Sequence, residues 1–214
     1  MEKKPVLIIG AGGLGKAAQE IFASNEIVVY GFLDEDSKLH GKEIAEATVL
    51  GSPEQDELLD VIGDRCEVFI AADENSYRNT MVQLVKEKRK TMPMNAIHKL
   101  AHISESASIG YGNFIGAQAF IGALSQVGSH CIINAGAIVD YEVKLEDFVQ
   151  IGAGCIINGN VKIEESAFLG TGVTVVAGVN IGKGARVGAG SVVSRDVAAR
   201  ETVFGNPAQK LNSK

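Results

Sequence analysis

The chain has 214 residues, with 25 glycines, no tryptophan, 46% hydrophobic residues and a formal net charge of −6. At roughly 100 to 200 residues per domain, this length allows two small domains or one elongated domain. The acidic balance leaves no basic surface for a phosphate backbone and excludes nucleic-acid binding. The cysteines, Cys66, Cys131 and Cys155, form no CxxC pair or cysteine–histidine cluster, so we expect neither a disulfide framework nor a metal site.

The N-terminal segment MEKKPVLIIGAGG passes directly into a predicted strand and lacks the flanks of a signal peptide. No apolar run approaches the roughly 18 residues that a membrane-spanning helix needs. We therefore expect a cytoplasmic protein that does not insert into a membrane.

The first predicted unit is a strand, a glycine turn and an amphipathic helix in PVLIIGAGGLGKAAQEIFASN. Gly10, Gly12 and Gly15 have the spacing GxGxxG, and the backbone amides at such a helix start bind phosphate. The motif alone is a weak signal, because a tight turn between a strand and a helix uses the same glycines.

The second predicted strand, IVVYGFLDED, brings Asp34 to a position 19 residues after Gly15. A nicotinamide-dependent dehydrogenase places its ribose-binding carboxylate at about this distance. A dehydrogenase is therefore the competing interpretation of the N-terminal region.

The length of the N-terminal region argues against a complete dinucleotide-binding fold. After TVLG, Ser52 and Pro53 are expected to open a helix with Gln55 as its capping partner. A strand at EVFIAA and a helix through Lys90 complete the pattern. Residues 1–92 are thus predicted to form a half-Rossmann α/β domain of three or four strands, which suits one nucleotide. We expect a sugar-nucleotide pocket where the strands end.

The rest of the chain is dominated by a six-residue repeat. Period six fits one short strand plus one corner, and three such units close an 18-residue coil that stacks on the next coil. Residues 93–214 are therefore predicted to be a parallel β-helix of between five and six coils with a C-terminal tail. The repeated aliphatic residues are Ile97, Ile103, Ile109, Ile115, Ile121, Val127, Ile133, Val139, Leu145, Ile151, Ile157, Ile163, Leu169, Val175, Ile181, Val187 and Val193.

Two other positions of each hexad are also restricted. The residue after the aliphatic is usually glycine or small and polar, as in Gly116 and Gly122, and we expect these residues to adopt the positive φ of a corner. The residue four places after the aliphatic is small or β-branched, as in Ala119 and Cys131, and is expected to fill the interior.

Repeats of this kind resemble the left-handed β-helix of the hexapeptide acyltransferases, and the tail VFGNPAQKL is similar to the usual exit from these prisms. The segments IIGAGGLGK, YGFLDED, AADENSYR, IINAGAIVDYE and NGNVKI occur in the order typical of one family. Nearly the whole chain resembles the sialic-acid O-acetyltransferase and bacterial UDP-sugar N-acetyltransferase (NeuD/PglD-like) family. The resemblance implies an acetyl-CoA-dependent homotrimer with acetyl-CoA between adjacent prisms.

The same resemblance implies functional positions and a substrate, a UDP- or dTDP-amino sugar in bacterial surface-glycan biosynthesis. Residues matching the sugar-nucleotide site are Gly12, Gly13, Leu14, Asp34, Glu35 and Asp73. Residues matching the acetyl-CoA site are Gln150, Thr171 and Ala189.

Three positions depart from the family pattern. Leu14 replaces a histidine of the glycine loop, Tyr141 replaces the general-base histidine, and Gln150 replaces a histidine that contacts acetyl-CoA. The acidic partner of the family base is retained as Glu142.

The loss of the imidazole affects proton removal more than positioning. Imidazole titrates near pH 6.5, whereas a phenol titrates near pH 10 and is a poor proton acceptor at neutral pH. We therefore interpret Tyr141 as a hydrogen-bond donor or a wall, with Glu142 as the remaining acceptor. An amine that arrives partly unprotonated needs less help than a hydroxyl, which favours N- over O-acetylation. The alternative is a catalytically impaired relative that binds sugar nucleotide or serves as a scaffold.

The remaining histidines are expected to be structural or solvated, and His130 is expected to be exposed at a corner. Phe114, Ile132 and Phe168 share a column with Gln150 and are expected to be exposed apolar residues that a neighbouring copy covers.

Overall fold

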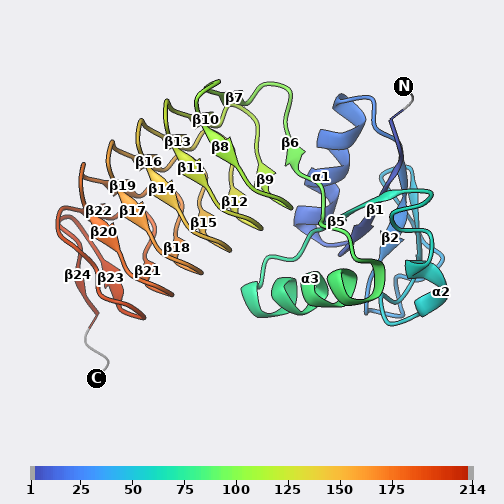
Figure 1. The fold of residues 1–214 in the computed structure, drawn as a ribbon. Helices are drawn as coiled ribbons and strands as arrows, with labels where there is room; N and C mark the ends of the chain where they lie inside the picture. Colours follow the sequence, from blue (N-terminus) through green and yellow to red (C-terminus); the bar gives the residue numbers. More distant parts are fainter. Residues whose placement is uncertain (1–2, 212–214) are drawn as a thin grey trace. The chain divides into compact units, whose positions relative to one another are not determined.

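A computed structural model of the chain describes residues 3–211, and its contacts define two compact units, Met1–Lys99 (unit 1) and Leu100–Lys214 (unit 2). The boundary proposed from the sequence, between residues 92 and 93, falls slightly before this division. Among the described residues, helices occur in unit 1, and unit 2 is a stack of short strands (Figure 1).

Unit 1 is an α/β half-Rossmann domain, as predicted, although its sheet has five strands where three or four were expected. Its sheet has the strand order β3-β4-β2-β1-β5, in which β4, β2, β1 and β5 are parallel and β3 is antiparallel to β4. Buried side chains fill β1, which is typical of a parallel strand covered on both faces. The elements are β1 (Val6–Ile9), α1 (Gly13–Ser24), β2 (Val29–Leu33), β3 (Glu43–Ile44), β4 (Ala47–Gly51), α2 (Asp56–Leu59), β5 (Glu67–Ile70), α3 (Asn75–Arg89) and β6 (Ala96–Ile97).

The short second helix begins later than the sequence suggested. The Gln55 side chain accepts a hydrogen bond from Ser52 N at 2.9 Å, and Ser52 Oγ accepts one from Glu54 N at 3.2 Å. These bonds close a turn over Ser52–Gln55, and α2 starts only at Asp56. The expected capping pair therefore forms, but it belongs to the turn before the helix.

Unit 2 is the predicted left-handed parallel β-helix, a prism with three faces. Face 1 contains β7 (His102–Ile103), β10 (Phe120–Ile121), β13 (Ile138–Val139), β16 (Ile156–Ile157), β19 (Thr174–Val175) and β22 (Val192–Val193). Face 2 contains β8 (Ser108–Ile109), β11 (Gln126–Val127), β14 (Lys144–Leu145), β17 (Lys162–Ile163) and β20 (Asn180–Ile181). Face 3 contains β9 (Phe114–Ile115), β12 (Ile132–Ile133), β15 (Gln150–Ile151), β18 (Phe168–Leu169), β21 (Arg186–Val187), β23 (Thr202–Phe204) and β24 (Gln209–Lys210).

The register of the strands confirms the 18-residue coil. Phe120 pairs with Ile138, and Ile138 pairs with Ile156, so each face repeats after three hexads. The repeated aliphatic residues from Ile115 to Val193 are buried, and the second interior position is buried too. One aliphatic side chain and one small or β-branched side chain per hexad thus fill the narrow core, which leaves no room for large aromatic residues at these positions.

The glycines that follow the aliphatic residues have a different role from the one expected. The positive φ angles of the coils fall two residues later, for example at Gln118 (58°) and Asn160 (61°). A Cβ on Gly116 would lie 2.6 Å from Ala135 N of the next coil. Glycine is therefore required there because successive backbones approach closely, and the positive-φ prediction for these positions was wrong.

Candidate functional site

The glycine loop connects β1 to α1 in unit 1. Gly10 has a φ of +108°, and a Cβ there would meet the Ala71 backbone, so only glycine fits. Gly12 caps α1 without a side-chain hydrogen bond, and the space around Gly12 and Gly13 is open. The first amides of α1 have no partner within the helix, which makes this helix start suitable for a phosphate group.

Leu14 lies at the same helix start but does not belong to the open surface. Its side chain is 7% exposed and faces the core of unit 1. Leu14, where the resemblance implies a histidine, therefore packs in the core and offers no polar group to a ligand.

Asp34 holds the glycine loop against the end of β2. Its Oδ2 accepts a hydrogen bond from Ala11 N at 2.8 Å, and its Oδ1 accepts one from Asp36 N at 2.9 Å. Its own backbone is tied to Gly51 O and to the His40 ring. The carboxylate thus shapes the loop, and a carboxylate oxygen that accepts one hydrogen bond still has a lone pair for a ligand.

Glu35 is linked to α3 by a tyrosine that the sequence reading missed. Tyr77 is half-buried and its phenol is hydrogen-bonded to Glu35. Burial, followed by the negative charge of Glu35, raises the pKa of Tyr77. The phenol therefore stays protonated and donates to the carboxylate.

Arg78 organises the loop between β5 and α3 and was also missed. Its side chain is 1% exposed, and its guanidinium donates to Ala72 O, to Asp73 O at 3.2 Å and to Asn75 Oδ1. The backbone of the loop is thereby held while the Asp73 side chain stays exposed. The sequence feature that could have identified Arg78 is the position of an arginine in the first helical turn after ADENS.

The predicted sugar-nucleotide residues of unit 1 come together at one edge of the sheet. The strands β2, β1 and β5 are neighbours and parallel, and the loops with Gly12, Asp34 and Asp73 follow their carboxyl ends. This is the edge where open α/β sheets bind their ligands.

Tyr141 lies in unit 2 at the corner between faces 1 and 2. Its ring covers Gly159 of the next coil, where a Cβ would lie 2.5 Å from Tyr141 Cζ. Its backbone N–H donates to Asp140 Oδ1 at 2.8 Å, and its carbonyl accepts from Asn160 N at 3.1 Å. The side chain remains 49% exposed, so the phenol is placed by the coil stack but stays accessible.

Glu142 follows at the same corner, with a φ of +56° and an exposed side chain. Its backbone N–H donates to Ala123 O at 2.8 Å in the preceding coil. The two predicted catalytic residues are therefore adjacent on an exposed corner of the prism.

The predicted acetyl-CoA residues lie elsewhere on unit 2. Thr171 and Ala189 are exposed and stacked at the corner between faces 3 and 1, where Gly190 N donates to Thr171 O at 2.8 Å. Gln150 is partly exposed on the outer side of β15 in face 3. The width of face 1 separates Thr171 and Ala189 from Tyr141, so one chain does not assemble the whole predicted set.

The outer columns differ from the sequence-based expectation. Phe114 and Ile132 are only 6% and 4% exposed within the chain, and Phe168 is half-buried beneath the Arg186 guanidinium. The predicted exposure of this column was therefore wrong. The exposed apolar column is on face 1 and consists of Phe120, Ile138 and Ile156.

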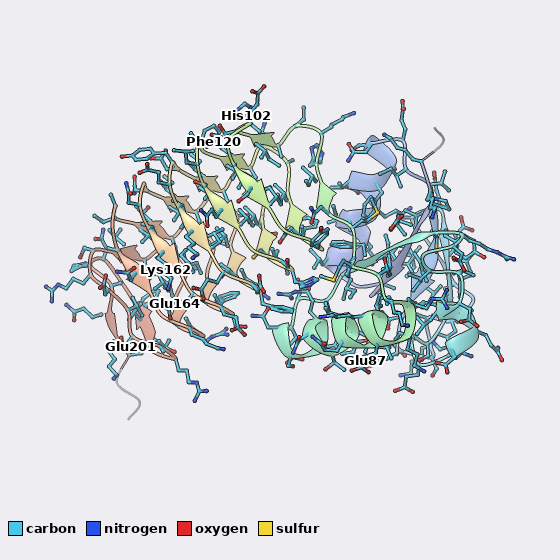
Figure 2. All side chains as sticks on the ribbon, viewed as in Figure 1. Glu87, His102, Phe120, Lys162, Glu164 and Glu201 are labelled. Carbon is cyan, nitrogen blue, oxygen red and sulfur yellow. The ribbon has the colours of Figure 1, made fainter. Side chains whose placement is uncertain are left out.

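Two histidines of unit 2 pack against aromatic rings. His130 is 4% exposed and its ring lies 5.0 Å from Phe148, so the prediction of an exposed corner side chain was wrong. His102 is exposed and stacks on Phe120 at 5.4 Å on face 1 (Figure 2).

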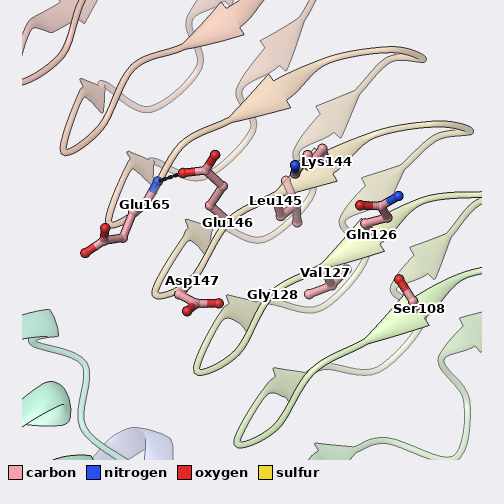
Figure 3. A pocket seen from close by; sticks show the side chains of 9 residues that line it. All are labelled: Ser108, Gln126, Val127, Gly128, Lys144, Leu145, Glu146, Asp147 and Glu165. Atoms are coloured by element: carbon pink, nitrogen blue, oxygen red, sulfur yellow. Dashed lines mark hydrogen bonds between the residues drawn. The ribbon is translucent and has the colours of Figure 1, made fainter.

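A cavity of about 400 Å³ lies over face 2 but contains none of the predicted site residues (Figure 3). Its acidic groups are bonded within the protein: Asp147 Oδ1 accepts from Ser129 N at 2.7 Å, and Glu146 Oε2 accepts from Glu165 N at 3.1 Å. These contacts connect successive coils and explain the charges without a ligand.

Residues 3–211 contain no group of three or more histidine, cysteine, aspartate or glutamate side chains that could hold a metal ion. In the same part of the chain, no helix is long and apolar enough to cross a bilayer.

The two units define the class of protein to which the chain belongs. Residues 5–85 match the PglD N-terminal domain, residues 106–141 match the hexapeptide repeat of succinyl-transferase, and residues 160–195 match the bacterial transferase hexapeptide. The class is therefore a hexapeptide-repeat acyltransferase with a PglD-type N-terminal domain.

Solved structures narrow this class to a family. A variant of GDP-perosamine N-acetyltransferase from Caulobacter crescentus, in complex with CoA and GDP-perosamine, is 31% identical over 98% of this chain and 97% of its own, with a TM-score of 0.91. The acetyltransferase domain of PglB from Neisseria gonorrhoeae, in complex with acetyl coenzyme A, is 29% identical over 98% and 100%, with a TM-score of 0.88. WeeI from Acinetobacter baumannii is 28% identical over 97% and 99%, with a TM-score of 0.82. The chain belongs to the NeuD/PglD-like family of sugar acetyltransferases.

One curated relative is a viral protein. An uncharacterised protein of Acanthamoeba polyphaga mimivirus is 31% identical over 129 residues, which are 60% of this chain. The match spans only 24% of the viral protein's length.

Proposed function

We propose that the chain is an acetyl-CoA-dependent N-acetyltransferase whose acceptor is an amino sugar linked to a nucleotide in bacterial surface-glycan biosynthesis. The observation that carries the proposal is the match of both units, in order and over nearly their full length, to an enzyme captured with CoA and a nucleotide-linked amino sugar. We place the reaction in the cytoplasm, where nucleotide sugars and acetyl-CoA are both available.

The nucleotide would bind at the carboxyl edge of the unit 1 sheet. The open helix start at Gly12 and Gly13 suits the phosphate groups, since its amides are free of intrahelical partners. Glu35 and Asp73, on loops held by Tyr77 and Arg78, would contact the nucleoside or the sugar.

Acetyl-CoA would bind between neighbouring copies in a homotrimer. Thr171 and Ala189 lie at one corner of the prism and Tyr141 at another, so a complete site requires the first corner of one copy and the second of its neighbour. The exposed apolar column of Phe120 and Ile138 on the intervening face supports a surface that another copy covers.

The chemistry at the Tyr141 corner would depend on an acceptor that is already a free base. The amine nitrogen attacks the thioester carbonyl, a tetrahedral oxyanion forms, and it collapses with release of the CoA thiolate. Backbone N–H groups at the corners can stabilise the oxyanion, and the phenol of Tyr141 can donate a hydrogen bond. In the tetrahedral intermediate the attacking nitrogen carries an extra proton, and Glu142, exposed beside Tyr141, would accept it.

The test measures binding and turnover separately. Titration calorimetry with acetyl-CoA and with UDP-, dTDP- and GDP-amino sugars should show saturable binding of both classes, and a thiol-release assay should show acetyl transfer. Binding of nucleotide sugar without transfer to any acceptor would favour the second candidate, a non-catalytic binding protein. The presence of Tyr141 at the predicted base position is the observation that favours this candidate. Absence of binding by either class would reject both candidates.

A further inference from the structure

Arg186 lies on the same face of the prism as the predicted acetyl-CoA residue Gln150. Gln150 on β15 pairs with Phe168 on β18, and Phe168 pairs with Arg186 on β21, so their side chains form one column on the outside of face 3 (Figure 1). Neighbouring strands are about 4.8 Å apart, so Arg186 lies roughly 10 Å along the prism from Gln150. The predicted acetyl-CoA residues Thr171 and Ala189 accompany this column at the corner that follows β18 and β21.

The Arg186 guanidinium is oriented by the protein without being neutralised by it. Its Cζ lies 4.6 Å from the centre of the Phe168 ring, which is the geometry of a cation–π contact. The side chain is exposed, and within residues 3–211 it forms no ion pair with a carboxylate. An oriented and exposed guanidinium presents a planar set of N–H donors, which suits an anionic ligand and above all a phosphate group.

The last coils of the prism are basic, although the whole chain has a net charge of −6. Residues 166–211 contain two carboxylates, Asp196 and Glu201, and both are bonded within the protein. Asp196 Oδ1 accepts from Asn180 N at 2.8 Å, and Glu201 Oε2 accepts from Ala198 N at 2.9 Å. The local excess of positive charge attracts a polyanion to this end of the prism. The basic residues of the same segment are Lys183, Arg186, Arg195, Arg200 and Lys210.

Phe204 adds an exposed aromatic ring next to the Arg186 column. The strand β23 pairs with β21, so Thr202 lies beside Arg186, and Phe204 extends over the residues that follow. The ring covers Gly188, where a Cβ would lie 2.4 Å from Phe204 Cδ2, yet the side chain remains 55% exposed. The ring is therefore held against the backbone beside Ala189, and its exposed part can stack on a planar group such as a nucleobase.

We propose that Arg186 and Phe204 bind the 3′-phospho-ADP half of acetyl-CoA, an inference that rests on the proposed acetyl-CoA-dependent function. The guanidinium contacts a phosphate group, and the ring stacks on the adenine. Acetyl-CoA fits this surface because its phosphates and its base are at the opposite end of the molecule from the thioester. The thioester would lie at the level of Gln150, and the arm between the two ends would extend along face 3. Neither Arg186 nor Phe204 is among the positions that the family resemblance implies.

The experiment measures the binding of acetyl-CoA and of 3′-phospho-ADP to the full chain by titration calorimetry. We expect 3′-phospho-ADP to bind saturably and to compete with acetyl-CoA. Arg186→Gln should lower the affinity for both ligands about tenfold, because one charge-assisted contact is lost. Arg186→Lys should cause a smaller loss, since it keeps the charge but not the planar fork.

Variants of Phe204 test the stacking separately from the charge. Phe204→Leu should lower the affinity for both ligands about tenfold, whereas Phe204→Tyr keeps the ring and should retain most of the affinity. Retention by the tyrosine and lysine variants distinguishes ligand contacts from a merely structural role. The unfolding temperature of each variant without ligand shows whether it remains folded.

Matched controls lie at the corner between faces 2 and 3. Arg200→Gln removes the same charge as Arg186→Gln, and Tyr111→Leu removes an exposed ring in the first coil. Both controls should affect the affinity for acetyl-CoA much less than the matching changes at Arg186 and Phe204. Failure of 3′-phospho-ADP to compete with acetyl-CoA, or equal losses in the variants and their controls, would overturn the inference.

The outcomes separate this inference from the proposed function. Acetyl-CoA that binds normally to Arg186→Gln and to Phe204→Leu would reject only the inference. Competition by 3′-phospho-ADP in a chain that transfers no acetyl group would support the inference and count against the proposed catalysis. Absence of acetyl-CoA binding to the wild-type chain would reject both.

Discussion

The packing of Tyr141 on Gly159 predicts that Gly159→Ala destabilises the wild-type protein but stabilises a Tyr141→Ala variant. An alanine at Gly159 would place its Cβ 2.5 Å from Tyr141 Cζ and 2.7 Å from Cε2, so the ring must leave its position. The φ of Gly159 is not positive, and alanine is therefore compatible with the backbone itself. The substitution is unfavourable only because of the ring.

The size of the effect follows from the area that the ring covers. A tyrosine buries roughly 200 Å² when fully enclosed, and Tyr141 is 49% exposed, so about 100 Å² is at stake. At ~25 cal/mol per Å² this is an upper limit of about 2.5 kcal/mol, and we expect Gly159→Ala to destabilise the protein by about 1 to 2 kcal/mol. In a Tyr141→Ala background the same substitution should stabilise it by about 0.4 to 1 kcal/mol, through the unfolded chain.

Thermal unfolding of the four proteins of this double-mutant cycle, at one protein concentration, measures the coupling between the two residues. The wild-type background should lose several degrees of Tm with Gly159→Ala, whereas the Tyr141→Ala background should gain one or more. A shift of equal sign and size in both backgrounds would refute the packing argument. Acetyl transfer by Gly159→Ala should also fall if the position of Tyr141 matters for the reaction.

Three further predictions concern the two sites and the core. Tyr141→His should raise kcat for acetyl transfer by up to about 10²-fold if only a base is missing, and a fall measured in the thiol-release assay would show that the phenol has its own role. Asp34→Asn should weaken nucleotide binding about tenfold in calorimetry, because an amide cannot accept from both Ala11 N and Asp36 N, whereas Asp36→Asn should not. Folding raises the pKa of Tyr77, so the folded protein holds the phenol proton more tightly than the unfolded chain does. The stabilising contribution of Tyr77 is therefore complete below about pH 10 and is lost as the pH rises further. The free energies of unfolding from denaturant titrations at pH 8 and pH 10.5 should consequently differ more for wild type than for Tyr77→Phe.

Local pattern was sufficient to predict unit 2 in most respects. Since each coil contacts only its neighbours, a hexad position has the same environment in every coil, and residues such as Ile133 and Cys155 could be assigned to the interior by spacing alone. The half-Rossmann arrangement of unit 1 was equally readable, because the glycine spacing and the strand lengths specify it without distant contacts.

Contacts between residues far apart in the sequence decided what the pattern could not show. The reason for Gly116, the burial of His130 and Phe114, and the position of the exposed apolar column depend on which backbones and side chains approach one another across 18 residues or more. Sequence spacing contains no information on such distances, since several residue types satisfy the same hexad position.

The candidate site shows the same division. The sequence by itself determined the fold class and the family resemblance, and it predicted tyrosine, glutamine and leucine at positions where the resemblance implies histidines. Only the tertiary structure showed that Leu14 packs in the core, that Asp34 holds the glycine loop, that Arg78 and Tyr77 support the neighbouring loops, and that Tyr141 rests on Gly159. The physical reason is that a residue's type limits the bonds it can form, whereas the partners that the fold brings within reach determine which of those bonds exist.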